Sequence, residues 1–212
     1  MSAMSRPAPV RRRNGRTERT RRALTEAALN LFVEQGYDAT TVDQIAAAAG
    51  VGQRTFFHHF ATKEAVLFGG YEERLREVTA GFRDAARFGT LWDGLYGATI
   101  SLVHAIESQR DLFLVRGRLY RETPSLRATM LRVNEDWIDS ITQIVAERLH
   151  LDPDTNVGPR LAATVANGAN RVAIDLWTAS SGQLDLDTLA HTAFTTIKPT
   201  IDAIERTAGE TR

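Results

Sequence analysis

Apolar residues recur at helical spacing along nearly the whole chain, and no stretch of any length alternates apolar and polar residues as a β-strand would. The clearest stripe follows the i, i+3, i+4, i+7, i+8 spacing of one buried helix face, and its members are Leu24, Ala27, Ala28, Leu31 and Phe32. Gly36 then ends this helix. The sequence therefore predicts an all-α fold of about nine helices.

The helices that follow are marked by capping residues and glycines. Thr41 with Gln44 three residues later has the form of a capping box, which opens a short helix that Gly50 stops. The same signals predict helices over 52–60, from 62 to about 85, and over 91–108, 111–121, 124–149, 157–180 and 184–207. Pro199 lies inside the last helix and is expected to kink it or interrupt its hydrogen bonding.

The composition excludes several classes of protein. The chain has no cysteine, so it has no disulfides, thiolate nucleophiles or cysteine-metal sites. We expect no secretory signal, because no apolar run follows the N-terminal arginines, and no stretch of the sequence approaches the roughly 20 apolar residues of a membrane span. We find no nucleophile-base-acid cluster, metal-ligand spacing or phosphate loop. We therefore expect a cytoplasmic protein that is not an enzyme, with no catalytic residues, metal, cofactor or membrane partner.

Charge is unevenly placed along a chain whose formal net charge is zero. The first 22 residues hold eight arginines and one acid, Glu18, a formal charge of +7, so the remainder carries −7. Because Lys and Arg supply most of the sequence-independent affinity for DNA, this end is suited to a polyanion. A solvated, disordered tail is the alternative for residues 1–15, which we expect to form a flexible arginine-rich arm.

Two short helices joined at Gly50, with the second following directly, are the arrangement of a helix-turn-helix. Ile45, Ala46 and Ala49 let the helices cross closely, and Val51 fills the angle between them. The glycine adopts a backbone conformation that other residues disfavour.

The second helix begins with side chains that suit base edges in a major groove, namely Gln53, Arg54 and Thr55. Arg grips guanine with two bonds, Gln pairs with adenine, and Thr reaches a phosphate or a thymine methyl. The spacing and these residue types together predict a DNA-binding head.

Here the sequence resembles the TetR family of regulators over residues 17–67, through the strings 36–46, 49–60 and Thr62-Lys63-Glu64. The resemblance implies a three-helix DNA-binding domain over 16–62 and a helical bundle over 63–212 that binds an effector and dimerises. It also implies that the DNA-binding residues are Thr41, Gln53, Arg54, Thr55, Phe57, His58, His59 and Lys63. Phosphates would be contacted by Thr41, Thr55, His59 and Lys63.

Three positions depart from the family's usual pattern. Gly52 stands where a serine often caps the recognition helix, so that cap is weaker here. Arg54 replaces a frequent glycine, and Phe57 replaces a common tyrosine, which removes a hydroxyl. We expect core packing rather than base stacking for Phe56, Phe57 and Phe60. Adjacent histidines lie about 100° apart on a helix, so we expect His58 and His59 to make surface contacts rather than bind one metal.

The last two predicted helices carry apolar stripes, which in TetR-like proteins pair across a two-fold axis to form a homodimer. The stripes are Leu161, Val165, Val172, Leu176 and then Leu186, Leu189, Phe194, Ile197, Ile201, Ile204. An ordinary core within one chain is the alternative.

Aromatic and polar residues on the central helices suggest a ligand pocket, and core packing is the alternative for each of them. They are Trp92, Tyr96, His104, Phe113, Tyr120, Trp137, Arg171 and Trp177. Arg171 and Asp175 lie one turn apart and are also placed to form a surface pair. The segment 171–177 resembles the C-terminal domain of regulators of the mycofactocin system, which implies a small apolar effector, with an acyl thioester as one candidate.

These observations predict a homodimeric, ligand-responsive repressor that a small effector releases from a palindromic double-stranded DNA operator. Gly69-Gly70 would weaken the helix that joins head to body and serve as a hinge. The alternative function is a helical ligand-binding or partner-binding protein whose DNA-binding head is weak or unused.

Overall fold

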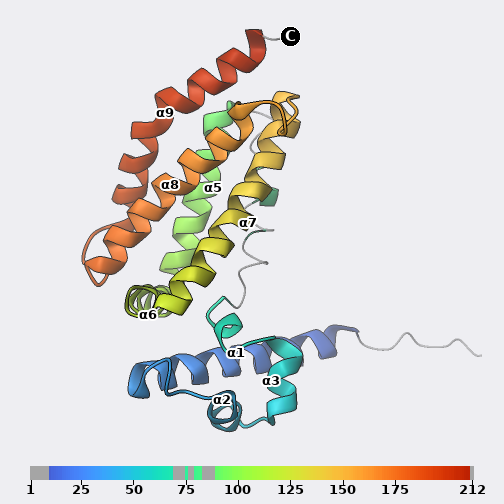
Figure 1. Cartoon of the computed structure of the whole chain (residues 1–212), viewed down its shortest axis with the longest axis vertical. Coiled ribbons are helices and arrows are strands. Elements are labelled where there is room, and N and C mark those ends of the chain that lie inside the picture. The colour runs from blue at the N-terminus through green and yellow to red at the C-terminus, as the bar shows by residue number, and fades with distance from the viewer. Residues whose placement is uncertain (1–9, 69–74, 76–78, 83–88, 211–212) are drawn as a thin grey trace, which may run out of the picture. The chain divides into compact units, whose positions relative to one another are not determined.

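The computed structural model describes residues 10–68, 75, 79–82 and 89–210. The chain divides into two compact units, residues 1–69 and 70–212, which we call the head and the body and treat separately. Every regular element in the described part of the chain is a helix (Figure 1), which confirms the all-α prediction. The head includes residues after 62, among which Val66 and Leu67 are buried.

The head contains α1 (Val10–Gln35), α2 (Val42–Ala48), α3 (Gln53–His59) and the 3-10 turn η1 (Glu64–Val66). Side chains from all four elements and their connections are buried together: Leu24, Ala28, Phe32, Tyr37, Ile45, Ala46, Phe56, Phe60, Val66 and Leu67. The stripe predicted for α1 therefore faces the core of the head through Leu24, Ala28 and Phe32.

Local residues determine where α1 ends and where α2 begins. Gly36, with φ +89°, ends α1 in a left-handed conformation. The predicted capping box of α2 is confirmed: the side chain of Thr41 accepts from the Gln44 amide at 3.2 Å, and the Gln44 side chain accepts from the Thr41 amide at 2.8 Å.

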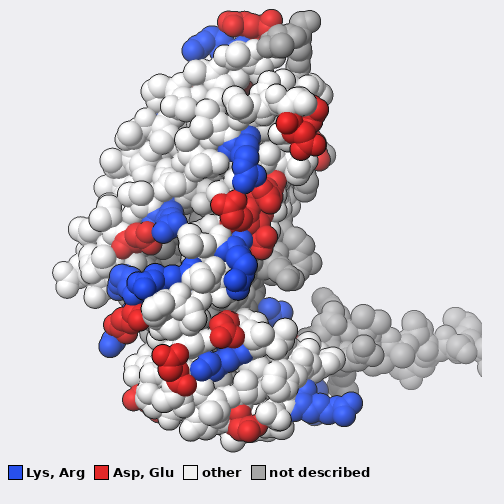
Figure 2. All heavy atoms as spheres, viewed as in Figure 1, with Lys and Arg blue, Asp and Glu red and all other residues white. Residues whose placement is uncertain are grey.

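The body contains α5 (Leu91–Glu107), α6 (Arg110–Glu122), α7 (Pro124–Leu149), α8 (Val157–Ala179) and α9 (Leu186–Glu210). The helices predicted from Leu91 onward are confirmed, with ends that differ by a few residues. On the face shown in Figure 2, acidic and basic side chains of the body are interspersed. Arg160, for example, pairs with Glu135 and Asp139.

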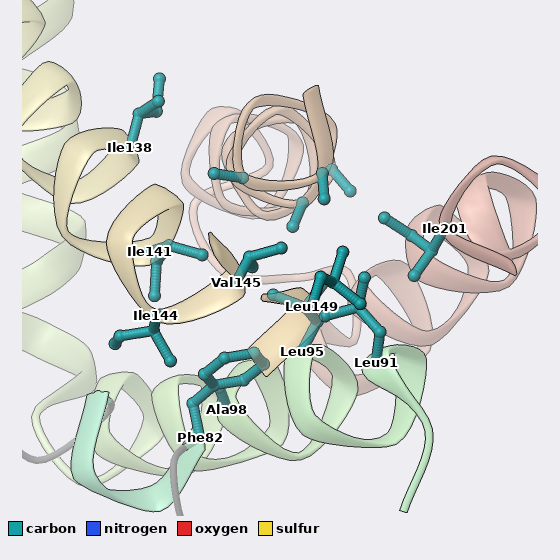
Figure 3. Close-up of a cluster of buried hydrophobic side chains, with 14 of the residues drawn as sticks. Phe82, Leu91, Leu95, Ala98, Ile138, Ile141, Ile144, Val145, Leu149 and Ile201 are labelled. Carbon is teal, nitrogen blue, oxygen red and sulfur yellow. The ribbon is translucent and has the colours of Figure 1, made fainter. Parts of the chain in front are cut away.

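The main core of the body lies among α5, α7, α8 and α9 (Figure 3). Helix α8 packs against both α7 and α9, and α9 also packs against α5. Leucine, isoleucine and valine side chains from α5 and α7 meet alanines of α8, which allow the helices to approach closely. The predicted α9 stripe contributes to two buried clusters. Phe194 and Ile201 are buried in the main core with Ile197 and Ile204 partly buried against it, whereas Leu186 is buried in a second cluster with Leu189 at its edge.

Helix α6 packs against the C-terminal end of α8. A Cβ atom added at Gly117 would lie 2.6 Å from Cγ2 of Thr178, so only glycine allows this approach. The guanidinium of Arg121 donates to the Oγ1 and the carbonyl of Thr178 at 3.0 and 3.2 Å. Arg110 donates to the carbonyl of Gly182 in the turn that follows α8.

Two predictions about helix continuity have different outcomes. Helix α9 runs through Pro199 and bends near its middle, where this proline lies, so the expected kink is confirmed (Figure 1). The helix expected from residue 62 begins instead with the 3-10 turn at Glu64, and most of its remainder lies outside the described residues. The predicted hinge, Gly69-Gly70, also lies outside them.

Candidate nucleic-acid interface

The turn between α2 and α3 is built on Gly50, whose φ is +68°. The Gly50 amide donates to the carbonyl of Ala47 at 3.0 Å, and the Val51 amide donates to the carbonyl of Ala46 at 2.9 Å. This pair of bonds is a Schellman motif, which satisfies the last carbonyls of α2 while reversing the chain. The glycine turn expected from the sequence is confirmed in this form.

Helix α3 presents one side to the core and the other to solvent. Phe56 is fully buried, whereas Gln53, Arg54, Phe57 and His58 are exposed. These four residues form a row at i, i+1, i+4 and i+5 along the helix, which we call the outer row. Gly52 caps the helix without a side-chain hydrogen bond, as expected for a glycine in this position.

The expectation that three phenylalanines pack in the core is confirmed for two of them. Phe56 and Phe60 are buried, but the side chain of Phe57 is 50% exposed, so the prediction was wrong for Phe57. Successive residues on a helix lie about 100° apart, so Phe57 cannot face inward beside Phe56. Its ring meets the Phe56 ring edge-on at 5.5 Å between centroids.

The C-terminal end of α3 lies beside the first half of α1. The guanidinium of Arg21 lies 5.3 Å from the centre of the Phe60 ring. Burial lowers the pKa of His59 below its ordinary value, and the neighbouring His58 and Arg21 lower it further, whereas Glu18 opposes them. His59 is therefore biased toward its neutral form in the free protein.

Lys63 has a structural role that the sequence did not indicate. Its ammonium donates to the carbonyls of Tyr37 and Thr40 at 2.7 and 2.9 Å and lies 4.1 Å from the centre of the Tyr37 ring. Next to it, the Tyr37 hydroxyl donates to the carboxylate of Glu64 at 2.5 Å. An ammonium has three donors, so one remains for the predicted phosphate contact.

The contacts in this cluster shift the pKa values of Tyr37 and Glu64. Burial and the hydrogen bond to Glu64 raise the pKa of the Tyr37 hydroxyl. Burial alone would raise the pKa of Glu64, but the bond from Tyr37, further hydrogen bonds and the charge of Lys63 together hold it below its ordinary value. The cluster is thus a charged, hydrogen-bonded connection across the head at neutral pH.

The predicted ligand residues fall into separate groups in the body. Trp92 and Tyr96 stack at 4.7 Å on α5, and the Tyr96 hydroxyl lies 2.7 Å from Nδ1 of His191 on α9. Phe113 and the fully buried Trp177 belong to a second core cluster. Trp137 is partly buried against the main core, and Tyr120 is partly buried on α6. Arg171 is exposed and lies 3.5 Å from Asp175, so the surface pair is confirmed.

His104, the last of the predicted ligand residues, lines a polar groove. The groove has a volume of about 420 Å³ and runs between the end of α5 and the turn before α9. Its lining includes Glu107, Arg110, Asp185 and Asp187. This groove is too polar and acidic to suit a small apolar effector.

The apolar stripe predicted on α8 is exposed in the single chain at Leu161, Val172 and Leu176, whereas Val165 is partly buried against the main core. Val157, one turn before Leu161, is exposed as well. Val157, Leu161, Val172 and Leu176 are all at least 44% exposed. A Cβ atom added at Gly168 in the middle of this stripe would meet nothing within 4 Å. We call Gly168 and these four exposed residues the α8 stripe.

Comparison with known proteins identifies both parts of the chain. Residues 24–68 match the family described as bacterial regulatory proteins, tetR family, and residues 89–202 match the MftR C-terminal domain. The chain is 31% identical over 217 residues to the HTH-type transcriptional regulator TcmR of Streptomyces glaucescens, which covers 93% of this chain and 91% of TcmR.

Solved structures share the fold. The regulator FadR from Bacillus subtilis, in complex with stearoyl-CoA, matches with a TM-score of 0.56 and 17% identity over 82% of this chain and 95% of FadR. The FadR repressor of Thermus thermophilus, in complex with lauroyl-CoA, matches with a TM-score of 0.56 and 25% identity over 82% of this chain and 91% of that chain. No described helix has the length and apolar character needed to cross a membrane.

Proposed function

This chain belongs to the TetR family of bacterial regulatory proteins, and it is a transcription regulator rather than an enzyme. We propose that it is a repressor that a small apolar effector releases from a palindromic operator. In this proposal a homodimer inserts two α3 helices into successive major grooves about 34 Å apart. Binding to the chromosome would place it in the cytoplasm.

The observation that carries the proposal is the outer row of α3. Gln53 and Arg54 stand exposed at the start of a short helix whose other side is anchored by the buried Phe56. Side chains on a helix held this rigidly are suited to read base edges, and Arg and Gln are the types that read guanine and adenine. Thr41, Thr55, His59 and Lys63 are the candidate phosphate contacts around this row.

Dimerisation is proposed through the α8 stripe with the outer side of α9. A group of exposed apolar side chains on one helix is typical of an interface, and Gly168 would let two copies of α8 cross closely. On α9, the exposed Thr192, Thr195 and Thr196 donate their hydroxyl hydrogens to carbonyls of their own helix. The hydroxyl hydrogens therefore need no further acceptor when a second copy covers them.

An acyl thioester is the effector that we propose. The two FadR proteins similar to this chain bind stearoyl-CoA and lauroyl-CoA. In the body, the indole nitrogen of the fully buried Trp177 has no hydrogen-bond acceptor among the described residues. A buried N–H without an acceptor costs about 1–3 kcal/mol, and a thioester carbonyl would satisfy it.

The proposal is tested with duplexes selected by the full-length protein from a random-sequence library. We expect a palindromic duplex that binds in the nanomolar range at physiological salt and is released by lauroyl-CoA. Failure to select any duplex would favour a helical binding protein with an unused head. Selection without release by lauroyl-CoA would retain the regulator and reject this effector.

A further inference from the structure

Helix α1 begins far ahead of the part that packs in the head. Its first residue is Val10, whereas from Gly15 onward, where burial is described, the first buried residue is Leu24. Residues 15–19 are all exposed, so they contribute nothing to the buried core of the head. We call residues 10–22 the α1 extension. A stretch of helix without a packing partner gains little stability from the fold, so its chemistry points to a partner outside the chain.

The chemistry of the α1 extension is basic throughout. Residues 11–22 contain seven arginines, the single acid Glu18 and no apolar side chain. Arg22 pairs with Glu26 at 2.8 Å. Arg16 and Arg19 are exposed and have no acidic partner within the described chain, and their spacing of three residues puts them on one side of the helix. This surface suits a polyanion and offers nothing to an apolar partner.

The α1 extension is continuous with the DNA-reading surface. Arg21 at its C-terminal end contacts the Phe60 ring at the end of α3, and its charge acts on His59. From Arg21 back to Val10 the helix rises about 16 Å, which is close to five base-pair steps of duplex.

We propose that Arg16 and Arg19 of the α1 extension form a second DNA-binding surface, which binds backbone phosphates flanking the base pairs read by α3. The inference rests on the proposed function. It assigns to the head a contact outside the helix-turn-helix, one that adds affinity and sets the length of the operator without reading sequence.

The test compares the full-length wild type with R16A/R19A by fluorescence anisotropy. The probes are two forms of the duplex selected by the wild type: one with long flanks and one trimmed to the selected palindrome. On the long probe, a dimer of the double variant loses four phosphate contacts, so the slope of log K against log salt falls by about 3.6. The variant should also lose most of the wild type's preference for the long probe.

The matched control is R132A/R118A, which removes two exposed arginines from the body. It should leave the salt slope and the flank preference unchanged. Equal slopes and equal flank preference for R16A/R19A and the wild type would overturn the inference while the operator still binds. Loss of all specific binding by the wild type itself would instead reject the proposed function.

Discussion

The hydroxyl of Tyr37 donates a 2.5 Å hydrogen bond to the carboxylate of Glu64, although 27 residues separate them in the chain. Helices α2 and α3 lie between these two residues in sequence. Lys63 also donates to the carbonyls of Tyr37 and Thr40, so these hydrogen bonds join the segment before α2 to the segment after α3. The position of α3 on α1 therefore depends on this polar cluster as well as on buried apolar side chains.

The substitution Tyr37→Phe removes this hydrogen bond and keeps the ring that packs against Phe32. Because the bond has a charged acceptor, we expect a loss of about 1.5–2 kcal/mol in the free energy of unfolding. Urea denaturation of Y37F, E64Q and the double variant, followed by circular dichroism, gives the coupling energy. A coupling energy near zero would show that the contact does not stabilise the head.

Acid should weaken the same cluster. The pKa of Glu64 is lower in the folded protein than the roughly 4.3 of an unfolded chain, so its carboxylate stabilises the fold fully above that unfolded value. The contribution is lost as pH falls through the folded pKa. Melting temperatures of the wild type and E64Q should therefore converge between pH 7 and pH 3. A constant difference across this range would contradict the assigned shift.

The contact between α6 and α8 can be tested at Gly117. An alanine there would meet Thr178 at 2.6 Å, so we expect Gly117→Ala to destabilise the protein by about 1–3 kcal/mol. Gly97 on α5 has nothing within 4 Å of its added Cβ, and Gly97→Ala should be neutral or stabilise by up to about 1 kcal/mol. Thermal unfolding that ranks the two variants in the opposite order would contradict this packing.

DNA binding should take up a proton at His59. Its pKa is lowered in the free protein, and a nearby phosphate would favour the charged imidazole and raise that pKa. Affinity for the selected duplex should therefore rise as pH falls from 8 to 6, by up to about tenfold per pH unit for each proton taken up. The variant H59Q should flatten this dependence, and an equally steep profile for H59Q would assign the proton elsewhere.

Charge placed in the α8 stripe should separate the proposed dimer. Leu161→Glu and Val172→Glu each put a carboxylate where two copies of α8 would meet, and burying an unpaired charge costs several kcal/mol. Light scattering after gel filtration should report monomers for both. Leu131→Glu is the control, since Leu131 on α7 is exposed to a similar degree outside the stripe. A monomeric wild type would reject the proposed interface.

The helix caps and turns could be predicted from the sequence because each depends on residues that are only a few positions apart. The capping box at Thr41, the left-handed Gly50 and the proline start of α7 each depend on near neighbours, and all three are present. Phe57 carried two conflicting expectations, since the aromatic run of α3 was assigned to the core while the family resemblance placed Phe57 among the DNA-binding residues, and the structure exposes it.

Long-range polar contacts left no pattern in the sequence. Nothing near Lys63 indicates that its ammonium caps two carbonyls more than 20 residues away. The apolar stripes of α8 and α9 look alike in sequence, yet Ile201 is buried within the chain while Val172 is exposed. Which stripe faces its own core depends on how the helices pack, and periodicity alone does not specify that.

The central claim is that the outer row of α3 reads bases, and duplex selection with a variant tests it most directly. Wild type, R54A and the control R132A are each used to select from the same random library, and the preferred base at every position is compared. We predict that R54A loses its preference at one position in each half-site and keeps the rest, whereas R132A matches the wild type. An R54A profile identical to that of the wild type, together with an unchanged profile for Gln53→Ala, would contradict the account.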